Sequence, residues 1–389
     1  MNMEPSLTGR KAFLTNLSSR RRKFSERRRQ NEKVNEAIEM ASIFSVTIDA
    51  GVLAVPQADC TDDNEVYRYI DTLLDWKKLL DEPWVAIYMR EGALASLADD
   101  DSYPSRPQLK ELFSAHRVKE YDVNTVATIV NRLLEVTPSF ETHYQLVNVL
   151  PDLLEIEPDI LKLTTSDALK EDLARCVVLI AILLKHCSQP LGGHFLILRN
   201  VPRDIIKVKA QIYDLEHNRN DIADLPSLHK VFEGDVLVCD DFRGLVKHLD
   251  ESTVLVRASD DLGIELAIRI AVFKYALRQG EEPDWGNSLV PNIGNEFREK
   301  CQRLCSKQDD SLPRKILRSI VETIKGDNMR DVHAIRIKSG GSSPQRKRGL
   351  DKAQRRDIDR EFHLHYWECA DGTIELASVV NHNDFSIPE

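Results

Sequence analysis

Residues 361–380, EFHLHYWECADGTIELASVV, have the pattern of two β-strands joined by a tight turn. Side chains of the first segment alternate between two faces, with Phe362, Leu364 and Tyr366 on one and His363, His365 and Trp367 on the other. Asp371 and Gly372 supply the Asp-Gly pair that tolerates the positive φ of a hairpin turn. We therefore expect the two segments to pair as antiparallel strands.

The residues before this hairpin extend it into a small α+β unit. Residues 333–338, HAIRIK, alternate like a strand, and residues 339–349, SGGSSPQRKRG, form a loop rich in Gly, Ser and basic residues. We expect a short polar helix over residues 350–360, LDKAQRRDIDR, and a longer helix over residues 313–326. The predicted unit spans residues 311–389.

The rest of the 389-residue chain has the features of a multidomain α/β protein, with helices over much of residues 100–190 and a central α/β sheet region after them. Strands are expected at 41–56, 84–89, 194–200, 208–216, 234–242 and 252–258, and helices at 108–115, 124–134, 140–150 and 167–186. The predicted divisions are a basic arm at 1–35, an N-terminal α/β and helical region at 36–190, an α/β region at 191–310, and the C-terminal unit.

Charge is distributed unevenly along the chain. The total is −10, yet residues 1–35 carry +7 and residues 330–360 carry +6, so the ends are basic and the body is acidic. This asymmetry favours contact between the ends and a polyanion, or docking of one end on the acidic body. We expect a cytoplasmic protein, because no apolar run is long enough to span a bilayer and the seven cysteines contain no CxxC pair.

The order of helix, strand, basic loop and aromatic, basic hairpin resembles the fold of RelE- and HigB-type toxins, which cleave messenger RNA without a metal. The resemblance implies no cofactor and a catalytic cluster made from Arg355, Arg356, His363, His365, Tyr366 and His382. Histidines titrate near neutral pH and arginines bind phosphate oxygens, which suits RNA cleavage. Nucleic-acid contacts are expected from Arg336, Lys338, Arg346, Lys347 and Arg348 in the unit, and from Arg21, Arg22 and Arg28 in the arm.

Two metal sites are alternatives to this cluster. Residues 41–91 resemble the start of PIN-type nuclease domains, in which a buried strand ends in an acidic metal ligand. That resemblance implies that Asp49 is a metal ligand. Glu91 follows the next strand, and two acids at the ends of two strands could converge on a divalent cation. The other possible site is made from His363, His365, His382 and Asp384.

Two classes of function follow from these patterns. The protein is either a nucleic-acid-cleaving effector of the toxin or phage-defence kind, directed at RNA, or a non-catalytic subunit that binds nucleic acid or a protein partner through its basic ends. A third interpretation assigns no chemistry to the hairpin, whose His, Tyr and Trp side chains would then only pack on a half-buried sheet. The sequence predicts no membrane partner.

Overall fold

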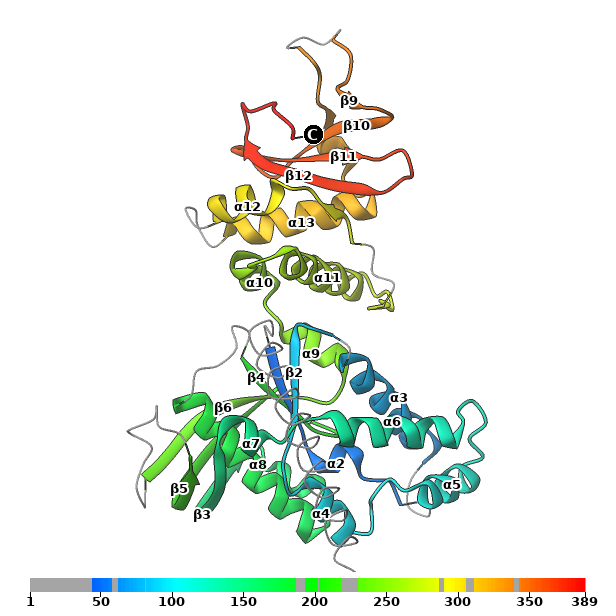
Figure 1. Cartoon of the computed structure of the whole chain (residues 1–389), viewed down its shortest axis with the longest axis vertical. Coiled ribbons are helices and arrows are strands. Elements are labelled where there is room, and N and C mark those ends of the chain that lie inside the picture. The colour runs from blue at the N-terminus through cyan, green and yellow to red at the C-terminus, as the bar shows by residue number, and fades with distance from the viewer. Residues whose placement is uncertain are drawn as a thin grey trace, which may run out of the picture.

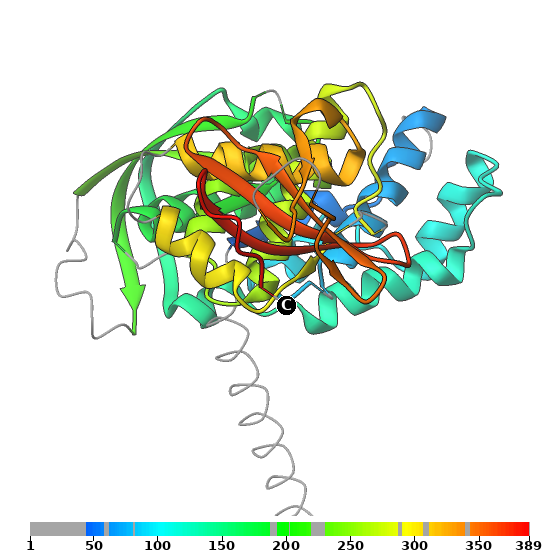
Figure 2. The ribbon, with the colours of Figure 1, turned by 90° about the horizontal axis from the view of Figure 1, so that it is seen from above.

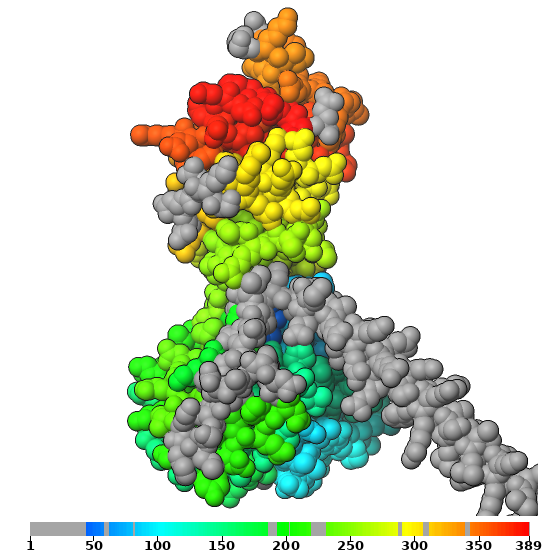
Figure 3. All heavy atoms as spheres, turned by 60° about the vertical axis from the view of Figure 1, so that its left-hand side comes forward, coloured from blue at the N-terminus to red at the C-terminus, as the bar shows by residue number. Residues whose placement is uncertain are grey.

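The computed structural model describes residues 44–57, 62–80, 82–186, 193–201, 203–218, 230–286, 290–305, 311–338 and 343–388. The predicted arm, with Arg21, Arg22 and Arg28, lies outside these residues. The described chain forms two lobes, each built on its own sheet, with helices α10 (Glu251–Arg257) and α11 (Asp261–Arg278) between them (Figure 1). The molecule narrows at this helical layer (Figure 3). The predicted mixed α/β class is confirmed.

The first lobe contains a six-stranded sheet in the order β2-β1-β4-β6-β5-β3. Its strands are β1 (Phe44–Ile48), β2 (Val85–Met89), β3 (Leu146–Glu157), β4 (His194–Ile197), β5 (Ile205–His217) and β6 (Lys230–Cys239). The first four in the sheet order are parallel, and β5 and β3 add antiparallel strands at one edge. Both β1 and β2 are buried along their whole length, as expected for parallel strands covered on two faces.

Helices cover both faces of this sheet. One face packs on α8 (Asp167–His186), and the other packs against a larger core that includes α3 (Asp63–Leu79) and α6 (Val123–Val136). The remaining elements of the lobe are short: α2 (Ala50–Leu53), α4 (Ala93–Asp99), α5 (Arg106–Ala115), α7 (Phe140–Tyr144), η1 (Ile160–Leu163) and α9 (Phe242–His248). No helix among the described residues is long and apolar enough to cross a membrane.

The second lobe carries a sheet in the order β7-β12-β11-β10-β8, with β9 paired to β10. Its elements are β7 (Asn292–Ile293), α12 (Phe297–Cys305), α13 (Ser311–Lys325), η2 (Met329–Asp331), β8 (Val332–Ala334), β9 (Lys347–Arg348), β10 (Asp351–Asp357), β11 (Phe362–Glu368) and β12 (Ile374–Asn381). The predicted hairpin is confirmed, because β11 and β12 pair antiparallel around Gly372 at φ 85°. Seen from above, these strands overlie α12 and α13 and, beneath them, the first lobe (Figure 2).

Four local predictions are wrong. The strand expected at 41–56 ends at Ile48, because the Asp49 carboxylate caps the short helix α2. Residues 350–360 form strand β10 instead of a helix, because this segment pairs with β8 and β11 in the middle of the sheet, which outweighs its helix-favouring composition. Residues 252–258 were expected as a strand but form α10, whose first turn is capped by the Asp250 carboxylate. The helix expected at 140–150 stops at Tyr144, because Gln145 adopts a left-handed conformation and β3 begins at Leu146.

The sheets also cross the predicted boundaries between regions. β1 pairs with β4, so one sheet continues across residue 190. β7 pairs with β12, so the C-terminal sheet includes residues that precede 310.

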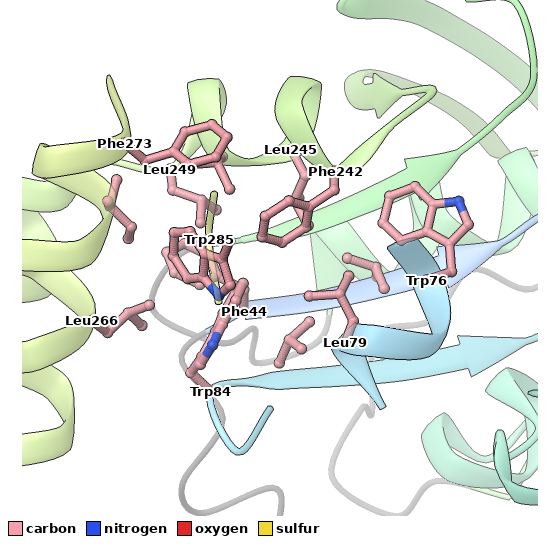
Figure 4. Close-up of a cluster of buried hydrophobic side chains, with 14 of the residues drawn as sticks. Phe44, Trp76, Leu79, Trp84, Phe242, Leu245, Leu249, Leu266, Phe273 and Trp285 are labelled. Carbon is pink, nitrogen blue, oxygen red and sulfur yellow. The ribbon is translucent and has the colours of Figure 1, made fainter. Parts of the chain in front are cut away.

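An aromatic cluster joins the first lobe to α11 (Figure 4). Trp285 lies at its centre, with ring centroids 5.7 Å from Trp84 and 5.1 Å from Phe242. The Trp285 indole N–H donates to Glu82 at 3.1 Å, and the Arg269 guanidinium stacks on the Trp285 ring at 4.5 Å. This packing fixes the helical layer on the end of the parallel sheet.

Candidate functional site

The strand register of the second lobe places several predicted site residues on one face of its sheet. His333 on β8 pairs with Arg355 on β10, and Arg355 pairs with His365 on β11. In the neighbouring row, Asp357 on β10 pairs with His363 on β11. Directly opposed residues share a face, so these five side chains lie together. The predicted alternation of the first hairpin strand is confirmed.

Three imidazoles converge near the Asp357 carboxylate. The His363 Nε2 atom lies 3.0 Å from Oδ1 of Asp357, and the His333 Nε2 atom lies 3.6 Å from Oδ2. The His382 ring lies against His363, tilted by 51°, with 4.4 Å between centroids. Burial lowers the pKa of His363, and the nearby Arg355 guanidinium lowers it further. Both effects favour the neutral imidazole. The His363 side chain is fully buried, whereas the His333 side chain is 46% exposed.

His365 is covered by the last described residues of the chain. Its Nδ1 donates to the Ser386 carbonyl oxygen at 2.9 Å, and the Trp367 indole N–H donates to the Pro388 carbonyl at 2.9 Å. Burial lowers the pKa of His365 to about 4. Its contact with Ser386 holds residues 383–388 on the sheet.

Arg356 and Tyr366 lie on the opposite face of the sheet, toward α13. Arg356 is completely buried and contacts the Glu322 carboxylate at 3.3 Å and the Asp327 carbonyl at 2.6 Å. Tyr366 belongs to the hydrophobic core, and burial raises its pKa to about 12. The expectation that these two residues join the histidines is therefore wrong, because the alternation along β10 and β11 directs them to the other side of the sheet.

A cavity of about 820 Å³ opens beside His333. It is lined by four Lys and Arg side chains and one imidazole, contributed by Arg336, Lys338, Arg346, Arg355 and His333. The described lining includes no acidic side chain; its other members are Val332, Ala334, Ile337, Phe385 and Ser386. The Arg355 guanidinium lies 4.9 Å from the centre of the Phe385 ring, which is 50% exposed.

Two predicted nucleic-acid contacts do not line this cavity. Arg348 makes close ion pairs with Glu375 at 2.8 Å and Asp351 at 3.1 Å, and stacks on Trp367. Lys347 is exposed on β9 but lies outside the lining. Within the basic loop, Arg346 therefore lines the cavity, whereas Arg348 is held in ion pairs. The sequence analysis did not identify Phe385 as a cavity residue. Its only signal in the sequence is that it is an aromatic residue in a polar C-terminal stretch.

A second cluster of acidic side chains lies at the carboxyl end of β1. Asp49 is 7% exposed, and its Oδ2 accepts a hydrogen bond from the Gly51 amide at 2.8 Å. Burial and the nearby Asp172 carboxylate raise the pKa of Asp49 to about 7. Asp172 lies on α8 and is bound by Arg90 at 2.6 Å. Nothing in the sequence linked Asp172 to Asp49, because they are distant along the chain.

The predicted partner of Asp49 has a different position. Glu91 is exposed, and its backbone N–H donates to the Glu141 carboxylate at 2.8 Å. The carboxylate that acts on Asp49 is that of Asp172. Among the described residues, no group of three or more His, Cys, Asp or Glu side chains is arranged to hold a metal ion, at Asp49 or near His382 and Asp384.

The chain was compared with known proteins in three ways. The two resemblances inferred from the sequence remain predictions, and function is inferred from the two clusters just described. Comparisons with protein-family models, with curated proteins and with solved structures found no match.

Proposed function

We propose that the second lobe binds single-stranded nucleic acid in its basic cavity. The observation that carries this proposal is the lining of the cavity, where Arg336, Lys338, Arg346 and Arg355 gather with no acidic side chain among the described lining residues. Phosphate groups are bound by such clustered cations, and the release of counterions favours binding. Arg355 lines the cavity, and its buried Nη1 atom has no hydrogen-bond partner among the described residues.

Phe385 makes the cavity suited to a single strand. Its ring is half exposed at the cavity and is stacked by Arg355 on one side. Exposed aromatic rings beside a basic groove stack on unpaired bases, and such contacts contribute about 1–3 kcal/mol per base. A duplex keeps its bases stacked on each other and offers no free base face to Phe385.

The binding test uses fluorescence anisotropy with short labelled oligo(U), oligo(dT) and duplex. Arg336→Gln combined with Arg346→Gln should weaken binding of the single strands about tenfold or more. It should also reduce the slope of log K against log salt by about 1.4, since each lost phosphate contact on a single strand removes about 0.7. The matched control, Lys162→Gln with Lys207→Gln, removes the same charge from exposed sites on the first lobe.

Two results would contradict the binding proposal. One is unchanged affinity in the cavity variant. The other is an equal loss in the control, which would mean that only net charge matters. Comparison of oligo(U) with oligo(dT) then decides whether RNA is preferred.

RNA cleavage is a second candidate function, favoured by the position of His333. This imidazole lines the cavity, and the Asp357 carboxylate beside it contacts His363 as well. Cleavage needs a base that takes the 2′-hydroxyl proton, an acid that protonates the leaving 5′-oxygen, and cations on the phosphate. His333 would act as the base, Arg355 would bind the phosphate, and solvent water would protonate the leaving oxygen. Asp357 would hold the orientation of the His333 ring.

The cleavage test uses 3′-labelled RNA in EDTA, with and without ribosomes. Wild-type protein should cut RNA and leave DNA of the same sequence intact. His333→Asn should abolish cutting while the affinity for oligo(U) changes less than twofold. Cutting that persists in His333→Asn would exclude this role, and no cutting by wild-type protein in either reaction would leave binding as the function of the cavity.

A further inference from the structure

The order of strands reverses next to β1 in the first lobe. From β1 the chain moves to β2 on one side, and it later returns to β4 on the other side of β1. In open α/β sheets this switch point, at the carboxyl ends of the strands, is where ligands bind. Here a cavity of about 620 Å³ lies at that position, lined by residues that follow β1 and β4 and by the segment that leads into α8. Its size is typical of small-molecule sites.

A buried carboxyl group at the base of this cavity has an unused acceptor. Asp49 lines the cavity and is 7% exposed, and no described residue donates a hydrogen bond to its Oδ1 atom. Buried acceptors are nearly always paired, because an unpaired one keeps its full desolvation cost. Behind it, the Oδ2 atom of Asp172 also lacks a partner among the described residues. Asp49 thus offers a ready acceptor for a ligand that donates hydrogen bonds.

The charge of the lining selects a cation. Asp100, Asp101 and Glu111 line the cavity together with Asp49, and among the described lining residues the one basic side chain is Arg199. Arg199 is already engaged, since one of its terminal nitrogens donates to the backbone carbonyls of residues 52 and 54 at 3.0 and 2.7 Å. Its guanidinium also stacks on the Tyr69 ring at 5.0 Å. The acidic groups therefore make the electrostatic potential inside the cavity negative.

Apolar side chains line the cavity together with these acids. The lining includes Val55, Leu112, Leu163, Leu169, Leu173 and Leu198. A ligand that matches this lining has ammonium groups separated by methylene chains, because the ammonium groups pair with carboxylates and the methylenes contact the leucines. A single metal ion needs several oxygen ligands in one small shell and leaves the apolar part of the cavity unmatched.

We propose that the cavity between β1 and β4 binds an aliphatic polyamine, with one ammonium group paired to the unpartnered Oδ1 of Asp49. The carboxylates of Asp100, Asp101 and Glu111 bind the remaining ammonium groups. This site lies in the first lobe, and the proposal is independent of the nucleic-acid cavity in the second.

The test is calorimetric titration of the full-length chain, freed of nucleic acid, with spermidine and putrescine at pH 7. Asp49→Asn should weaken spermidine binding at least tenfold, while Glu155→Gln, which removes an exposed acid from β3, should have no effect. Titration in two buffers of different ionisation enthalpy should reveal proton release on binding to the wild type. The ammonium group lowers the raised pKa of Asp49 and drives out its proton. This release should be absent in Asp49→Asn.

Glu111→Gln provides a second variant at the rim, expected to weaken spermidine binding severalfold if Asp49→Asn fails to fold. The proposal is overturned if wild-type protein binds neither polyamine, or if both cavity variants that fold bind like the wild type. It is also overturned if Mg²⁺ or Mn²⁺ alone binds and displaces spermidine, because the site would then be a metal site.

Discussion

Replacement of Asp49 by Asn should make the protein more stable, by an amount that grows with pH. The side chain is almost fully buried, and its pKa is raised from 3.8 to about 7, first by burial and then by Asp172. Folding therefore favours the protonated form. The free energy of unfolding is unaffected by this group below pH 3.8 and falls as pH rises toward 7, because ionisation is easier in the unfolded chain.

The size of the effect follows from the pKa difference. A difference of about 3 units at about 1.4 kcal/mol each gives a cost of about 4 kcal/mol once the pH exceeds 7. At pH 5 the same relation gives about 1.5 kcal/mol. Asparagine has nearly the same shape, stays neutral at every pH, and can still accept the hydrogen bond from Gly51. The stability advantage of the variant should grow by about 2–3 kcal/mol between pH 5 and pH 8.

Urea unfolding at pH 5, 6, 7 and 8 measures this difference. The transition of the first lobe can be followed by the fluorescence of Trp76 and Trp84, which are buried there. Glu155→Gln is the control for loss of an exposed acid and should follow the wild type at each pH. A constant difference between Asp49→Asn and wild type across this range would refute the reasoning, because the Asp49 carboxyl would then ionise equally in both states.

Two further predictions concern the lobe junction and the second sheet. Trp285→Ala should lower the free energy of unfolding by about 3–5 kcal/mol, because it opens a cavity among aromatic rings and removes a hydrogen-bond donor from Glu82. A loss under 1 kcal/mol in urea unfolding would contradict the packing described at the junction. In the wild type, the free energy of unfolding should fall by about 3 kcal/mol as pH drops from 6.5 to 4, because the pKa of His365 in the folded protein is lowered to about 4 and its protonation opposes folding. His365→Gln should remove this loss. Acid unfolding followed at Trp367 checks this, and identical pH profiles would contradict it.

Local patterns in the sequence were sufficient for several elements. The β11–β12 hairpin was predicted from the alternation at 362–367 and the Asp-Gly turn, and the buried strand β1 from its apolar run. Helices α8 and α13 lie where helices were predicted. These features depend on interactions between residues close in sequence, so composition and spacing describe them well.

Strand β10 shows where local patterns fail. Its seven residues, DKAQRRD, favour a helix by propensity, yet they pair with strands on both sides. Pairing partners contributed by distant segments decide the conformation, and the sequence gives no direct sign of them. The same error placed Arg356 among the catalytic candidates, although β10 directs it into an ion pair with Glu322 on α13.

The sequence by itself determined the types of residue available: a basic C-terminal segment with clustered histidines, and acidic residues after buried strands. The tertiary structure alone decided which of them meet. It gathered Arg336, Arg346 and Arg355 around one cavity while Arg348 was paired with Glu375. It also brought Asp172 toward Asp49. The physical reason is that burial and charge pairing act between residues that are close in space, and this closeness exists only after the strands and helices have packed.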